Sequence, residues 1–134
     1  MIFAGADATG FEDRHCTLYY TWRAQIRRSY TKLSASSDMK TQLVCAVVIQ
    51  HHPISHDVRH FPQMLEWMVT VTTPWIFVLN MGYDAEWVHQ MIRQHHILSI
   101  IPVRKREDCP IYRIRGRYRK QMRRSFDCIT YPSM

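Results

Sequence analysis

Short apolar runs, each ended by turn-forming residues, give this chain its main pattern. One run spans Trp75 to Leu79, is rich in β-forming side chains and stops at Asn80-Met81-Gly82. A run of this length between turn residues is typical of a buried strand. Asp84 then precedes an amphipathic stretch that reaches about His96, and an aspartate at such a position is a common helix cap. The pattern predicts a strand with Asn80 at its carboxyl end, followed by a helix that Asp84 caps.

Similar patterns predict the other elements. Ile2 to Ala6 is expected to form a strand that presents Asp7 at its tip. Gln42 to Gln50 has an unbroken apolar centre, which suits a strand buried on both faces. A helix is expected over about Val58 to Thr70, because its apolar side chains recur at helical spacing. Ile97 to Val103 is expected to be a further strand.

The order of these elements is strands, helix, strand, helix and strand, which predicts an α/β fold with a sheet of mixed strand direction. All 134 residues fit one domain. Ser34 to Asp38 is rich in small polar residues and is expected to be a loop. Gly116 to Arg124 has the pattern of a helix start, but we expect too little chain to follow for a complete final helix.

The composition is that of a globular protein, with 46% hydrophobic and 22% charged residues. No apolar run is long enough to cross a bilayer, and the N-terminus lacks the basic start and apolar core of a secretory signal. The four cysteines are far apart and form no Cys-x-x-Cys pair, so neither a zinc ribbon nor a redox pair is expected. These features predict a cytoplasmic protein with reduced thiols and no membrane partner.

Positive charge is concentrated between Arg104 and Arg124. This segment contains ten basic residues and two acidic ones, so it carries +8 in a chain whose net charge is +7. Such a local concentration indicates a polyanionic partner, most often nucleic acid, and the alternative is a solvated charged face. The residues that we expect to contact DNA are Arg104, Lys105, Arg106, Arg113, Arg115, Arg117, Arg119, Lys120, Arg123 and Arg124.

Arginine alternates with other residues from Arg113 to Arg119, so an extended chain would place four guanidinium groups on one face. Tyr112 and Tyr118 lie among them and are expected to stack on exposed bases. Contacts of this kind to phosphates would give strongly salt-dependent binding with little sequence preference.

Asp7 and Asn80 both follow predicted strands, so their side chains are candidates for one shared site. Neighbouring strands lie about 4.8 Å apart. Two hard cations roughly 4 Å apart, held by carboxylates, can activate water for phosphodiester cleavage. An asparagine supplies one neutral oxygen and binds Mg²⁺ far more weakly than a carboxylate does. The simpler alternative is that Asp7 only starts a turn.

Several motifs occur in an order known from one family. With I-F-A-G-A-D-A-T-G-F, W-I-F-V-L-N-M-G-Y-D-A-E, I-I-P-V-R and G-R-Y-R-K-Q-M-R-R, the chain resembles the DDE transposases of bacterial and archaeal insertion sequences over essentially its whole length. The resemblance implies a ribonuclease-H-like mixed sheet flanked by helices. It also implies DNA transposition, in which Mg²⁺ or Mn²⁺ ions held by two Asp and one Glu cut DNA and join the freed 3′ ends to a target. The implied partners are insertion-sequence ends, target DNA, and a second copy or an intact transposase.

At the level of single residues, Asp7 matches the first catalytic, metal-binding Asp of the family. The second catalytic position is Asn80, and Met81 stands where a Lys is usual. Asp84 matches a family Asp that is not a metal ligand. The catalytic Glu and its C-terminal helix have no match before Met134, nor has the family's N-terminal DNA-binding region. The resemblance therefore implies a partial, inactive catalytic domain that binds DNA, with marginal stability and exposed apolar surface.

Histidines suggest a competing function. His52, His56 and His60 recur at a four-residue spacing, which on one helical face would suit zinc or nickel. Pro53 is expected to keep His52 off the helix, however, and the family carries His-Asp where this chain has His56-Asp57. The alternative function is a non-catalytic DNA- or metal-binding regulator of an intact transposase.

Overall fold

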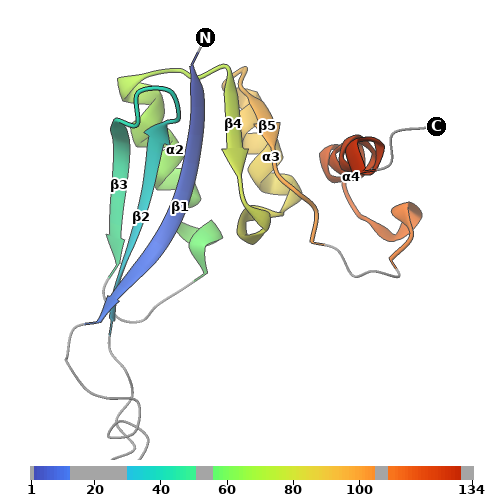
Figure 1. The fold of residues 1–134 in the computed structure, drawn as a ribbon, viewed down its shortest axis with the longest axis horizontal. Helices are drawn as coiled ribbons and strands as arrows, with labels where there is room; N and C mark the ends of the chain where they lie inside the picture. The colour runs from blue at the N-terminus through green and yellow to red at the C-terminus, as the bar shows by residue number, and fades with distance from the viewer. Residues whose placement is uncertain (1, 13–29, 51–55, 105–108, 131–134) are drawn as a thin grey trace, which may run out of the picture.

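The computed structural model describes residues 2–12, 30–50, 56–104 and 109–130. Figure 1 shows the elements as a ribbon. In chain order they are β1 (Phe3–Glu12), β2 (Tyr30–Asp38), β3 (Val44–Gln50), the 3-10 turn η1 (Asp57–His60), α2 (Phe61–Val71), β4 (Ile76–Leu79), the 3-10 turn η2 (Met81–Tyr83), α3 (Glu86–Gln94), β5 (Leu98–Ile100), the 3-10 turn η3 (Ile111–Arg113) and α4 (Arg117–Thr130).

β1 is the central strand of a five-stranded sheet with the order β3-β2-β1-β4-β5. β2 runs antiparallel to β1 and β3, whereas β4 runs parallel to β1 and β5. A mixed sheet with helices confirms the predicted α/β class and is compatible with a ribonuclease-H-like fold. The connections through α2 and α3 both advance toward β5, so right-handed crossovers place both helices on one face (Figure 1).

α2 and α3 each bury one apolar side against this face of the sheet. In α2 the buried residues are Phe61, Met64, Leu65 and Met68. The Phe61 ring lies edge-on to Phe77 of β4, with centroids 5.6 Å apart, and to Tyr83, with centroids 5.7 Å apart. The two helices expected between the last three predicted strands are therefore confirmed. None of the helices among the described residues has the length and apolar character needed to span a membrane.

The expected loop from Ser34 to Asp38 is wrong, because this stretch is the second half of β2. It pairs with β1 on one side and with β3 on the other. Ser34 and Ser36 are almost fully buried. Small polar residues predict a loop from their local preferences, but here backbone pairing on both sides determines the conformation.

The expectation that Gln42 to Gln50 is buried on both faces is also wrong. β3 lies at the edge of the sheet. Ala46 and Val48 are each 6% exposed, whereas Val47 and Ile49 are 36% and 58% exposed. Only one face of this strand is covered, although both faces carry apolar residues.

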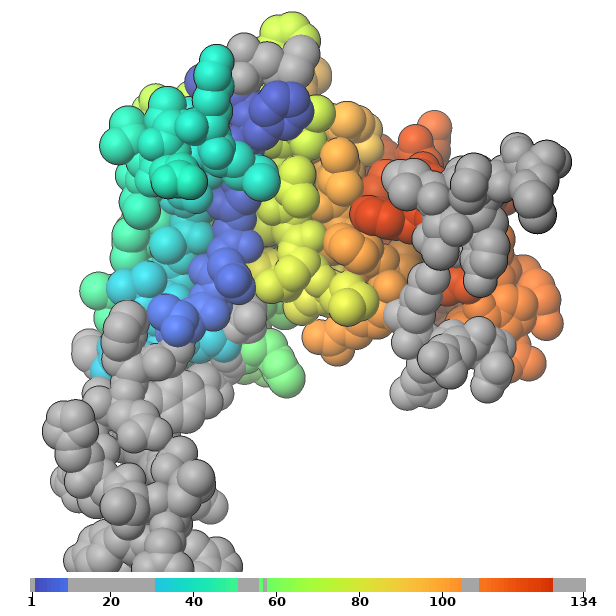
Figure 2. Space-filling model, viewed as in Figure 1, coloured from blue at the N-terminus to red at the C-terminus, as the bar shows by residue number. Residues whose placement is uncertain are grey.

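The opposite face of the sheet bears the exposed apolar surface that the resemblance implies. Met39 and Leu98 are exposed in addition to Val44, Val47 and Ile49 of β3. In Figure 1 none of the described helices lies over this face, and Figure 2 looks onto it. Contiguous apolar surface of this kind often marks an interaction site.

α4 is a helix of 14 residues, so the expectation that no final helix is completed is wrong. Its apolar side carries Met122 and Phe126, which pack with Val103 and Ile114 in a second, smaller core. In Figure 1 this helix lies beyond β5, past the edge of the sheet. Amphipathic spacing is sufficient for the helix to form here, because a surface is present to receive its apolar side.

The segment from Arg113 to Arg119 is not extended, so the condition under which its arginines would share one face is not met. Ile111–Arg113 is a 3-10 turn and the helix begins at Arg117, so the four arginines do not share the face of a strand. Between the two elements, Gly116 has a φ of 101°. That backbone conformation favours glycine, and it lets the chain turn into α4.

The first turn of α4 is capped by a residue of another helix. The Glu86 carboxylate, at the start of α3, accepts hydrogen bonds from the backbone N–H of Tyr118 (3.1 Å) and of Arg119 (3.2 Å). α4 has no acidic residue of its own in this turn. Glu86 therefore satisfies two helix N–H groups and places negative charge at the positive end of the helix dipole.

Gly116→Ala is expected to lower the free energy of unfolding by about 2 kcal/mol or more, because the residue would be strained at positive φ. Its Cβ would also overlap the Glu86 carboxylate and displace it from the start of α4. Denaturant unfolding followed by circular dichroism measures the change. Gly5→Ala is the matched control, since its Cβ would lie 3.4 Å from the flexible Met39 side chain. Equal losses in the two variants would contradict this role of Gly116.

Candidate functional site

The structure brings Asp7 and Asn80 together, as the sequence predicts. The parallel pairing of β1 with β4 ends at Ala6 and Leu79, so the next residue of each strand lies beside the other. The Asn80 amide donates from Nδ2 to Oδ1 of Asp7 over 3.2 Å. Asp7 does not lie at a strand tip, however, because β1 continues to pair with β2 as far as Glu12.

The orientation of the Asn80 amide is fixed by its second contact. Its Oδ1 accepts a hydrogen bond of 2.9 Å from the backbone N–H of Gly82, which opens η2. The amide therefore presents its N–H₂ group to Asp7, and this group cannot coordinate a cation. Oδ1 of Asp7 also accepts from the backbone N–H of Ala8 over 2.8 Å. One carboxylate beside an amide donor does not fit a centre that holds two divalent cations.

No group of three or more His, Cys, Asp or Glu side chains suited to a metal is found among the described residues. His52 lies outside the described residues. Nε2 of His60 is 2.6 Å from Oε1 of Gln50, and His56 has extended backbone before η1. The described part of the chain thus offers no support for the alternative histidine site.

An apolar groove of about 630 Å³ lies on the open face of the sheet and reaches the Asp7–Asn80 pair. Its floor is made by alternate residues of β1, β2 and β4, most of them small. The lining residues that mark its extent are Gly5, Asp7, Ala35, Met39, Val44, Val78 and Asn80. The two polar side chains are therefore exposed at one end of an otherwise apolar surface.

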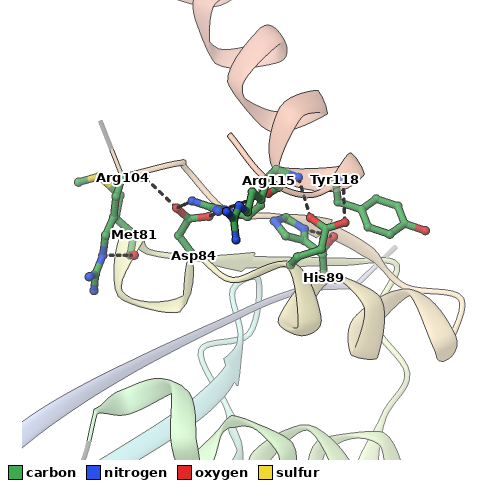
Figure 3. Close-up of polar contacts among 9 residues, drawn as sticks. Met81, Asp84, His89, Arg104, Arg115 and Tyr118 are labelled. Carbon is green, nitrogen blue, oxygen red and sulfur yellow. Dashed lines mark hydrogen bonds and ion pairs between the residues drawn. The ribbon is translucent and has the colours of Figure 1, made fainter. Parts of the chain in front are cut away.

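Asp84 does not cap α3, contrary to expectation, since the cap position is Ala85. The Asp84 side chain is 1% exposed and serves another contact. It accepts two hydrogen bonds from the Arg119 guanidinium, over 2.8 and 2.9 Å, and one of 3.0 Å from the backbone N–H of Arg104 (Figure 3). Asp84 thus ties the start of α4 and the end of the β5 segment to the turn that follows β4.

Arg119 makes its hydrogen bonds within the protein, whereas the sequence predicts that it contacts DNA. Its third nitrogen, Nη1, donates to the backbone carbonyl of Arg115 over 3.3 Å, so all three guanidinium nitrogens have protein acceptors. Hydrogen bonding to Asp84 raises the pKa of Arg119, and burial acts against this effect. Arg104 is similarly engaged, with Nε donating to the carbonyl of Met81 over 3.1 Å.

Three other basic residues of the predicted set lie together on the surface of α4. Arg117, Lys120 and Arg124 line an open groove of about 660 Å³ along α4, together with Gln121 and Ser125. The spacing of these residues places them on one side of the helix. Arg113 and Arg115 are also exposed, and Arg123 is half-buried. Lys105 and Arg106 lie outside the described residues. We call Arg117, Lys120 and Arg124 the basic face of α4.

Tyr118 is half-buried and packs against α3, whereas the sequence suggests that it stacks on bases. Its ring is stacked on His89 with centroids 6.0 Å apart, and the Arg93 guanidinium lies 5.1 Å from its centroid. Tyr112 differs, because 76% of it is exposed.

His89 is a buried residue that the sequence prediction missed. Its Nδ1 lies 2.7 Å from Oγ of Ser99, and no partner for its buried Nε2 is present in the described part of the chain. Burial lowers the pKa of His89; the charges of Glu86 and Asp84 act against this and those of Arg93 and Arg119 add to it. Its position between Val88 and Ile92 on the apolar side of α3 is the signal that indicates burial.

No protein-family model matches the chain, and no curated protein matches it. A similar solved structure is Endonuclease V of Ciona intestinalis in complex with a 24mer DNA containing an inosine followed by a ribo-adenosine. The identity is 9% and the TM-score 0.41, over 96% of this chain and 55% of that one. The chain thus spans about half the length of that structure.

The free energy of unfolding is expected to fall as the pH drops below 6.5, because His89 stays neutral in the folded protein. The unfolded chain then binds a proton at a pH where the folded chain does not. The stability that His89 contributes is fully present above pH 6.5, and it is lost between that pH and the lowered pKa of His89 in the folded state. Urea unfolding at pH 7.5 and 5.5 measures it. His89→Leu should reduce the pH dependence and the exposed control His95→Gln should retain it; identical dependence in the two variants would refute the assignment.

Proposed function

We propose that this chain is a DNA-binding protein related to DDE transposases, and that the basic face of α4 is its contact surface for DNA. The observation that carries the proposal is the division among its cations. Arg104 and Arg119 are engaged by protein acceptors. Arg117, Lys120 and Arg124 line an open groove, without an ion-pair partner among the described residues. Cations left available on one helical side suit the phosphate backbone of DNA.

The proposal includes the loss of strand cleavage. In DDE transposases, to which the motifs of this chain are similar, Mg²⁺ or Mn²⁺ ions at paired acidic residues cut DNA. Here Asp7 has the Asn80 amide as its neighbour, and that amide donates a hydrogen bond where a carboxylate would bind a cation. We therefore assign Asp7 and Asn80 to an inactive catalytic position. The proposed partners are insertion-sequence ends and target DNA.

A second candidate function is that this chain regulates an intact transposase, either by occupying its DNA or by binding to it. The separation of the two regions supports it. The basic face lies on α4, beyond the β5 edge, while Asp7 lies on β1, and both β4 and β5 lie between them. DNA binding through α4 would then persist without a working catalytic position, as a competitor of an active enzyme requires.

Binding of duplex DNA is expected to depend steeply on salt. The slope of log K against log salt concentration is negative. Replacing Arg117, Lys120 and Arg124 together by Gln should reduce its magnitude by about 3, since each phosphate contact contributes about 0.9. Fluorescence anisotropy over a salt series measures the slope. Lys40→Gln, in the exposed turn between β2 and β3, removes one charge elsewhere and should leave the slope unchanged. A triple variant with the wild-type slope would refute the assignment of the basic face.

Asn80→Asp is expected to strengthen Mn²⁺ binding at least roughly tenfold, or about 1.4 kcal/mol. The new carboxylate would stand beside Asp7, and the repulsion between them favours a bound cation. Isothermal titration calorimetry measures the affinity, and the gain should be absent when the same substitution is made in an Asp7→Ala background.

The wild type should not nick supercoiled plasmid with Mg²⁺ or Mn²⁺. Nicking that disappears in Asp7→Ala would show instead that the catalytic position is active.

A further inference from the structure

An exposed aromatic ring lies five residues before the basic face of α4. Tyr112 is 76% exposed, although aromatic rings are usually among the more buried side chains. We infer that this surface binds single-stranded nucleic acid in preference to duplex, and that Tyr112 stacks on one base of the single strand. The inference rests on the proposed function, because it specifies the kind of nucleic acid that the same surface takes.

Tyr112 is presented on an ordered turn. It is the middle residue of η3, which is closed by hydrogen bonds from the N–H of Arg113 to the carbonyl of Pro110 (3.0 Å) and from the N–H of Ile114 to that of Ile111 (3.1 Å). Ile114 is 6% exposed and belongs to the small core beneath α4. The packing of Ile114 fixes the end of this turn, so the Tyr112 ring is held outward. Less entropy is then lost when a base stacks on it.

The charges around the ring suit a single strand. Arg113 and Arg115 are exposed beside Tyr112, and the basic face follows at once along the chain. From Arg117 to Arg124 that face extends about 10 Å at 1.5 Å per residue, which matches two or three consecutive phosphates. A positively charged track with an adjacent aromatic platform is the usual arrangement for single strands.

A duplex would use only part of this surface. Its phosphates are accessible to the basic face, but its bases are stacked on one another and their faces are closed to an exposed ring. The other tyrosine of the segment, Tyr118, is half-buried and already stacked against His89 and Arg93, so its ring is less accessible to a base than that of Tyr112. Tyr112 is thus the feature that would distinguish a single strand from a duplex.

The test compares a labelled 20-nucleotide oligo-dT, a mixed-sequence 20-base-pair duplex and oligo-rU by fluorescence anisotropy at one salt concentration. The wild type should bind the single strands more tightly than the duplex. Tyr112→Ala should weaken oligo-dT binding roughly five- to hundredfold, the range expected for loss of one stacked base. Its duplex affinity should change less than about twofold. Tyr112→Phe keeps the ring and should retain wild-type affinity. Trp75→Ala removes an exposed aromatic ring just before β4 and, as the control, should also retain it.

The outcomes separate this inference from the proposed function. Equal weakening of single strand and duplex by Tyr112→Ala, or no weakening of either, overturns the inference while duplex binding by the basic face still stands. If the wild type binds none of the three probes, both the inference and the proposed function are overturned. If oligo-rU binds as well as or better than oligo-dT, the single-strand inference is supported and its source includes RNA; a clear preference for oligo-dT supports it with DNA as the source.

Discussion

Two carboxylates at the start of α3 hold the basic helix against the rest of the protein. α4 begins with Arg117, Arg119 and Lys120, close to the positive end of its own dipole, which is an unfavourable place for cations. Glu86 satisfies two of the N–H groups there, and Asp84 pairs with Arg119. The fold thus supplies the negative charge that the first turn of the helix lacks, while Arg117, Lys120 and Arg124 remain along its open side. Both the position of α4 and the charge it presents depend on this contact.

The Asp7–Asn80 pair follows from a different constraint, the register of two parallel strands. Because Ala6 and Leu79 are the last partners of β1 and β4, whatever residues follow them must lie side by side. The backbone therefore makes the juxtaposition, and the side chain at position 80 determines its chemistry. With Asn80, donor and acceptor complement each other and the contact is a closed hydrogen bond.

Sequence patterns predict this protein well where a segment's own residues determine its structure. The buried strand before Asn80, the apolar side of α2 and the meeting of Asp7 with Asn80 all follow from local periodicity and strand order. The failures occur where a neighbour from elsewhere in the chain decides. Ser34 to Asp38 is a strand because two strands pair with it, and β3 is half-exposed because only one face of the sheet is covered. Charge counting likewise gives ten similar cations, and only the fold shows that Arg119 is bound to Asp84.

The position of β3 at the sheet edge affects how the protein behaves in a crowded solution. From Leu43 to Gln50 the chain has no charged residue and no proline, the features by which natural edge strands usually repel one another. No strand in the described part of the chain pairs with its outer side. The edge itself therefore carries little that opposes strand-to-strand contact between molecules, and such contact becomes more frequent as the protein concentration rises.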